Sequence, residues 1–270
     1  MTDSNRPHLI GVDIEDLRLP VKDALHKAAE LKFQAVELPT VTGDLTPRNL
    51  SASGRRHLAR YVENLGLDLS ALAADIPALR LTDPRTVDER VTRTCEIIDL
   101  AKDLGAPIVT ASVGALTHPE TGGGSPLAVE ALHRIGEYAD ARGVVYAIRP
   151  SCDAGDRLAR VLDELRCPSI RIGLDPAAMV MSGVNPLSAV ERLPDRIALL
   201  HARDATAGLS DRPGRETQLG EGDVDFVGLL SLLEAAQYRG AFIVRRCDSP
   251  RPLADLQAAR DTFARALHTS

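Results

Sequence analysis

Short runs of apolar and β-branched residues alternate along the chain with longer stretches that have the periodicity of amphipathic helices. The expected strands cover 8–13, 33–38, 67–72, 106–112, 144–148, 169–174, 196–201 and 240–245. The expected helices cover 20–31, 51–65, 83–104, 125–141, 153–165, a short segment from 185, 225–236 and 252–267. Gly66 and Gly105 follow two of these helices and are typical helix-terminating residues.

Eight strand–helix units predict a parallel sheet, because a parallel strand pair needs a crossover connection between its members. Eight is also the number of strands that closes a (β/α)8 TIM barrel, so the predicted fold class is α/β with one such barrel. An open dinucleotide-binding sheet is the rival, but Gly11 and the residues after it do not form the G-x-G-x-x-G pattern. The sequence has no linker, repeat or low-complexity segment, so residues 1–270 are predicted to form a single domain.

Composition narrows the class of protein without naming a substrate. Hydrophobic residues make up 44% of the 270, aromatic residues only 3%, and the net charge is −6. The acidic balance argues against nucleic acid as a partner, and no apolar run is long enough to cross a bilayer. The four cysteines form no CxxC pair and the start lacks a secretory pattern, so we expect a cytoplasmic protein. A small-molecule substrate is the expected partner, and a homo-oligomer is compatible with the sequence.

Two arginines are the most unusual candidates for the site. Arg149 ends the run 144–148 and Arg245 ends the run 241–244, so both are expected at the C-terminal mouth of the barrel. A guanidinium is permanently cationic, so it can neither ligate a metal nor act as a base. The pair could bind an anionic group through forked hydrogen bonds, or it could form internal ion pairs with carboxylates. Arg246 is expected to point the other way, since side chains alternate along a strand.

Five further residues are candidates, each with a structural alternative. Asp175 and His201 end strands and could bind substrate or transfer protons, or they could be a buried ion-pair partner and a core histidine. Glu37 ends the second strand and could replace a missing base or pair with an arginine. His118 and Glu221 lie in loops and could reach an anionic substrate, although turn geometry alone accounts for the surroundings of Glu221.

The order of segments resembles the xylose-isomerase-like TIM barrel superfamily, specifically its sugar phosphate isomerase/epimerase branch. The similarity is strongest in GLDP (173–176), LLHARD (199–204), QLGEGDVDF (218–226) and YRGAFIV (238–244), with support from QAVE (34–37) and IDLAKDLGA (98–106). The resemblance implies a divalent cation held by Glu, Asp, His and Glu after strands 5 to 8. Asp175 and His201 match two of these positions, whereas Arg149 and Arg245 stand at the two glutamate positions.

Electrostatics then changes what the resemblance implies. A dication about 4 Å from each guanidinium would be repelled by about 8 kcal/mol per arginine at an effective dielectric constant near 20. We therefore predict no metal ligands and no cofactor here. The expected function is that of a sugar isomerase/epimerase-like protein that binds a small polyol, ketose or anionic sugar derivative. The alternative is a non-catalytic protein that binds an anionic metabolite or a protein partner.

Overall fold

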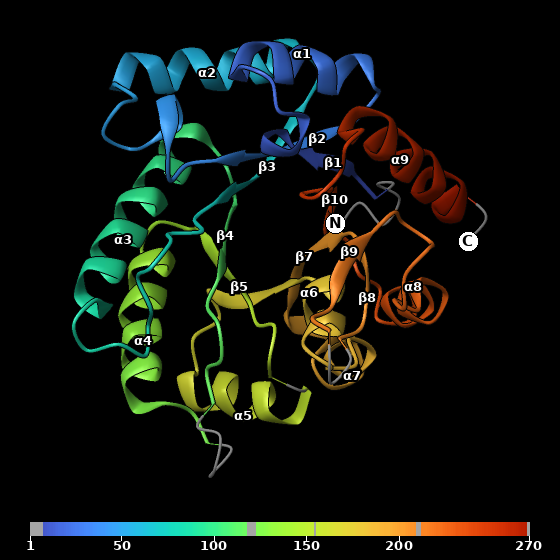
Figure 1. Ribbon diagram of the computed structural model, residues 1–270. Coiled ribbons are helices and arrows are strands. Elements are labelled where there is room, and N and C mark those ends of the chain that lie inside the picture. Colours follow the sequence, from blue (N-terminus) through green and yellow to red (C-terminus); the bar gives the residue numbers. More distant parts are fainter. Residues whose placement is uncertain (1–7, 118–122, 154, 209–211, 269–270) are drawn as a thin grey trace.

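The computed structural model describes residues 8–117, 123–153, 155–208 and 212–268. Its centre is a closed barrel of parallel strands in the order β1-β10-β7-β6-β5-β4-β3-β2 (Figure 1). The barrel strands are β1 (Ile10–Asp13), β2 (Ala35–Pro39), β3 (Asp68–Ala73), β4 (Ile108–Ser112), β5 (Val145–Arg149), β6 (Ile170–Leu174), β7 (Ile197–Ala202) and β10 (Phe242–Val244). Each overlaps one of the runs that the sequence predicts, so the predicted (β/α)8 barrel is confirmed.

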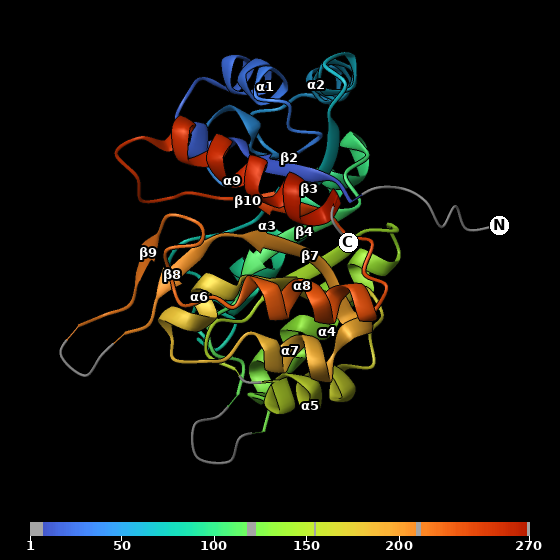
Figure 2. The ribbon, with the colours of Figure 1, turned by 90° about the vertical axis from the view of Figure 1, so that its right-hand side faces the viewer.

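Helices surround the barrel on its outside (Figures 1 and 2). They are α1 (Val21–Glu30), α2 (Ala52–Asn64), α3 (Val87–Leu104), α4 (Pro126–Asp140), α5 (Gly155–Leu165), α6 (Pro176–Met181), α7 (Leu187–Arg192), α8 (Phe226–Ala235) and α9 (Pro252–His268). Single 3-10 turns occur at η1 (Ile14–Leu17), η2 (Gly43–Leu45) and η3 (Pro194–Arg196). Among the helices described, none is long and apolar enough to cross a membrane.

The structure contains elements that the sequence pattern did not predict. Helix α6 begins directly after Asp175, whose side chain accepts a hydrogen bond from the Ala178 backbone N–H at 3.0 Å. An antiparallel hairpin of β8 (Asp204–Thr206) and β9 (Arg215–Thr217) follows β7 and projects from the barrel (Figure 2). Six-residue helices and three-residue strands are too short to show a hydrophobic period, which explains why they were missed.

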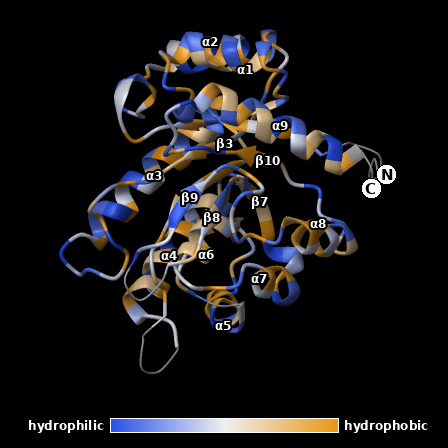
Figure 3. Cartoon of the chain, turned by 45° about the vertical axis from the view of Figure 1, so that its right-hand side comes forward, coloured by the Kyte–Doolittle hydropathy of each residue, from blue (hydrophilic) through white to orange (hydrophobic). Residues whose placement is uncertain are grey.

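Apolar side chains fill both sides of the strands. The large cluster lies between the outer faces of the strands and the helices, where Val12, Leu72, Ile148 and Leu174 are fully buried. A small cluster fills the barrel interior and consists of Ala71, Leu199, Ala241 and Ile243. The strands are accordingly almost uniformly hydrophobic, whereas the helices carry a polar outer face (Figure 3).

Above this small interior cluster the inward positions become polar. Successive side chains of a strand point to opposite faces, so inward positions recur every second residue. The register places Asp13 beside Glu37, Ser112 beside Arg149, and Ile243 beside His201. The inward residues nearest the C-terminal strand ends are Asp13, Glu37, Thr110, Ser112, Arg149, Asp175, His201 and Arg245.

Candidate functional site

A hydrogen-bonded glutamate and histidine lie at the centre of this polar layer. His201 Nε2 is 2.7 Å from Glu37 Oε2, and both side chains are fully buried. The Thr110 hydroxyl donates to the other carboxylate oxygen of Glu37. The two residues come from β2 and β7, which are separated by β1 and β10 in the barrel, so the folded barrel brings together residues that are distant in the sequence.

The charges around this pair set its protonation. Burial works to raise the pKa of Glu37, but the charge and hydrogen bond of His201 and the nearby Arg245 and Arg149 guanidinium groups lower it to about 2. Burial lowers the pKa of His201 below its ordinary value, although Glu37 opposes the shift. At neutral pH the glutamate is therefore a carboxylate and the imidazole is neutral. An ionised carboxylate only accepts, so we assign the imidazole proton to Nε2. His201 Nδ1 then has a free lone pair, and it is buried with no hydrogen-bond partner among the described residues.

Arg149 forms an ion pair with Asp75, the second residue after β3. Only 7% of the Arg149 side chain is exposed, whereas 41% of the Asp75 side chain is exposed. Partial burial works to raise the pKa of Asp75, but the charge of Arg149 and its hydrogen bond hold this pKa below its ordinary value. Asp75 also accepts from the backbone N–H of Ser112 at 2.7 Å.

Arg245 is held by two carboxylates near the end of β1. Its guanidinium lies 3.0 Å from Asp13 and 3.3 Å from Asp16. Burial raises the pKa of Asp13 well above its ordinary value despite the opposing charge of Arg245, and the Glu37 carboxylate adds to the increase. Arg246 lies 3.1 Å from Asp255 and 3.4 Å from Glu216.

Asp175 is bound by a different arginine from those considered in the sequence. Arg203, just after β7, donates to both Asp175 oxygens at 2.9 and 3.2 Å. Burial works to raise the pKa of Asp175, but Arg203 brings it far below its ordinary value. Arg203 also lies 3.4 Å from Glu216 of β9, so this arginine ties the hairpin to the strand ends.

The structure does not bring Glu221 into this cluster. Glu221 is exposed in the turn 218–224. Backbone N–H groups of this turn donate hydrogen bonds of 2.9 to 3.2 Å to the Asp204 carboxylate and hold the turn in place. His118 lies outside the described residues.

The arrangement does not fit the divalent cation that the resemblance implies. Asp175 is engaged by Arg203 and the α6 backbone, and His201 Nε2 is engaged by Glu37. Within the described part of the chain, no three His, Cys, Asp or Glu side chains are grouped so as to hold a metal ion. Arg149 and Arg245 occupy the positions where the resemblance implies two further oxygen ligands. What the site offers instead is a buried proton acceptor facing fixed guanidinium groups.

Sequence reasoning missed several partners in this network, namely Asp16, Asp75, Thr110, Arg203 and Glu216. Thr110 could have been found by counting inward positions back from the end of β4. Asp75 and Asp16 lie past the strand ends, where alternation no longer predicts direction. The repulsion calculated from Arg149 and Arg245 alone therefore omitted the carboxylates that form ion pairs with both arginines.

Comparison with known proteins gives three findings. The family model described as xylose isomerase-like TIM barrel matches residues 25–266. A xylose isomerase domain protein from Planctomyces limnophilus superposes with a TM-score of 0.82 at 20% identity, covering 98% of this chain and 97% of that one. A D-tagatose 3-epimerase-like protein superposes with a TM-score of 0.77 at 17% identity, covering 97% and 98%.

A shorter sequence match is more similar but covers little of either protein. The putative L-ribulose-5-phosphate 3-epimerase SgbU of Escherichia coli (strain K12) is 42% identical over 52 residues, 18% of each chain. The matched part therefore spans less than a fifth of that relative's length.

Proposed function

The chain belongs to the xylose isomerase-like TIM barrel family, and on that premise we propose that it is a sugar isomerase or epimerase that works without a metal. The substrate would be a small polyol, ketose or anionic sugar derivative bound at the C-terminal mouth. The observation that carries the proposal is the buried Glu37–His201 pair facing Arg149 and Arg245. Active sites of such barrels lie at this end of the strands.

In this proposal His201 is the catalytic base. Its free Nδ1 removes a proton from the carbon next to the substrate carbonyl, and Glu37 stabilises the imidazolium that forms. The electron pair of the broken C–H bond moves onto the carbonyl oxygen, which becomes an enolate oxygen next to a guanidinium. Transfer of the neighbouring hydroxyl proton to the enolate oxygen, together with return of the carbon-bound proton to the former carbonyl carbon, gives isomerisation and forms the new carbonyl at the carbon that lost its proton. Epimerisation would need a second proton donor on the opposite face of the enolate.

Access to the base depends on the ion pair between Arg149 and Asp75. Glu37 and His201 are fully buried, so a substrate must displace a group that covers them. Asp75 is the more exposed member of its pair, so it is the partner of Arg149 that a substrate can replace. We propose that Arg149 exchanges the Asp75 carboxylate for a substrate oxygen. The Arg149 guanidinium then places a positive charge beside the enolate oxygen, where a metal-dependent enzyme would place a metal ion.

The test is exchange of solvent deuterium into a panel of ketoses, aldoses and their phosphates, followed by NMR. The assay detects proton removal without knowledge of the product. Protein treated with a chelator is expected to exchange one substrate's proton at the rate of the untreated protein. Exchange that disappears with the metal would overturn the metal-independent mechanism, and no exchange with any sugar would overturn the enzymatic function.

None of the matches favours the non-catalytic alternative, and the named relatives are described as isomerase- or epimerase-like proteins. A cytoplasmic location is part of the proposal. It is supported by the four cysteines, Cys95, Cys152, Cys167 and Cys247, which are all free thiols.

A further inference from the structure

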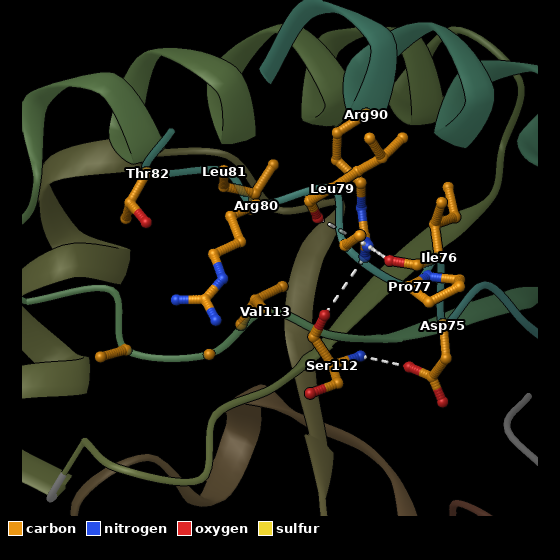
Figure 4. A pocket seen from close by; sticks show the side chains of 13 residues that line it. Asp75, Ile76, Pro77, Leu79, Arg80, Leu81, Thr82, Arg90, Ser112 and Val113 are labelled. Atoms are coloured by element: carbon orange, nitrogen blue, oxygen red, sulfur yellow. Dashed lines mark hydrogen bonds between the residues drawn. The ribbon is translucent and has the colours of Figure 1, made fainter. Parts of the chain in front are cut away.

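A groove lies beside the mouth, between the loop after β3 and the loop after β4 (Figure 4). Its volume is about 560 Å³, within the range of small-molecule sites. It is lined by residues 75–82, Arg90 and 112–115. Asp75 and Ser112 connect the groove to the site, because Asp75 holds Arg149 and Ser112 is paired with Arg149 in the register.

Arg80 is a cation without a partner in this groove. Its side chain extends from the loop after β3 toward the segment that follows β4 (Figure 4). The residue is exposed, and its guanidinium has no hydrogen bond or ion pair with any described residue. The nearby Asp83 is already bound by Arg85, with two contacts at 2.8 and 3.1 Å. Arg80 is therefore available to a ligand.

Arg90 provides a second positive charge at the wall of the groove. Only 2% of this residue is exposed, and its guanidinium donates to the backbone carbonyls of Ala74, Ile76, Leu79 and Ser112 at 2.9 to 3.4 Å. None of these partners is a carboxylate, and no ion pair of Arg90 occurs among the described residues. A buried charge without a counter-charge favours an anion nearby.

The segment after β4 adds backbone donors. Gly114 and Ala115 line the groove, and their backbone N–H groups make no hydrogen bond with described residues. Gly114 has a φ of 68°, a left-handed conformation of the kind that turns successive N–H groups toward one concavity.

We propose that this groove binds the phosphate group of a phosphorylated substrate, with Arg80 as the residue that selects it. The inference rests on the proposed function, because it assumes that the reacting end of the same molecule reaches His201. Two uncompensated cations match a dianion better than a monoanion, since Asp75 and Arg149 neutralise each other. Phosphate also has three acceptor oxygens for the guanidinium and the backbone N–H groups.

The geometry along β4 suits a short sugar. Thr110 contacts Glu37, and Ser112 borders the groove two residues further along the strand. Two residues of a strand span about 7 Å, close to the reach of about five single bonds. A phosphate in the groove therefore leaves a carbonyl a few carbons away within reach of the base.

The test is titration calorimetry at constant ionic strength with inorganic phosphate, acetate, a pentose and its 5-phosphate. Arg80→Gln is expected to weaken phosphate binding by at least about tenfold, because a charge-assisted hydrogen bond is lost. Arg56→Gln is the matched control, since Arg56 is an exposed arginine of α2 outside the groove lining, and it should leave binding within about twofold. Both variants should bind the unphosphorylated pentose as the parent protein does.

Equal phosphate affinities for the two variants would overturn the role of Arg80. Acetate that binds as tightly as phosphate would overturn the assignment to a phosphate group. Calorimetry measures binding without turnover, so the phosphate site and the enzymatic function can be refuted independently of each other. Phosphate that binds through Arg80 in a protein that exchanges no sugar proton refutes the enzymatic function alone.

Discussion

The substitution Glu37→Gln tests the proposed mechanism most directly, because it removes one charge and little volume. In the parent protein the carboxylate lies 2.7 Å from His201 Nε2 and also accepts from Thr110. The glutamine oxygen can still accept from His201, and its amide can donate to the Thr110 hydroxyl, which can turn to accept. Both contacts can therefore persist while the negative charge is lost.

The expected loss follows from the charge that forms on His201 during proton removal. With about 4 Å between the charge centres and an effective dielectric constant near 20, the carboxylate stabilises the imidazolium by about 4 kcal/mol. That energy corresponds to about three orders of magnitude in rate. Arg149 and Arg245 oppose the imidazolium, so losing the carboxylate leaves their repulsion less compensated.

The assay is the rate of deuterium exchange into the substrate, with nitrogen NMR of the imidazole to report its tautomer. Thr110→Val is the matched control, because it removes a hydrogen bond to Glu37 but keeps the charge. We expect this control to lower the rate by less than about tenfold, because the hydrogen bond of a neutral donor contributes only about 1 kcal/mol. A Glu37→Gln variant that keeps more than a tenth of the parent rate would refute the proposal that Glu37 stabilises the protonated form of a catalytic His201.

Three further outcomes are expected. The exchange rate should be constant through neutral pH and fall only below pH 6.5, because burial lowers the pKa of His201 and only its neutral form accepts a proton; an acidic limb centred above pH 6.5 would contradict this. Asp175→Asn should lower the free energy of unfolding in urea at pH 7 by about 3 to 5 kcal/mol, because Arg203 loses its buried partner. Arg203 lowers the pKa of Asp175, so the carboxylate's contribution is present above pH 3.8 and is lost as pH falls through the lowered pKa; the difference between parent and variant should therefore shrink in acid. Asp75→Asn should strengthen phosphate binding in calorimetry, because the groove loses the negative charge that holds Arg149; weaker binding would count against the exchange of Asp75 for substrate.

The sequence by itself determined the barrel and five of the side chains at its mouth. Alternating apolar runs and helical stretches predicted all of the barrel strands, because buried parallel strands leave a strong local signal. Strand ends then identified Glu37, Arg149, Asp175, His201 and Arg245 as residues of one face. The inward direction of these side chains follows from counting along each strand.

Only the tertiary structure decided which of these groups are partners. Glu37 and His201 are 164 residues apart, Asp75 and Arg149 are 74 apart, and the residues of the Asp16–Arg245 pair are 229 apart. No local pattern encodes such pairings, because they depend on barrel closure and on how far each side chain reaches across the mouth. The same closure buries the glutamate and histidine. Their ionisation is therefore set by the desolvation and surrounding charge of the folded barrel, which residue identity does not reveal.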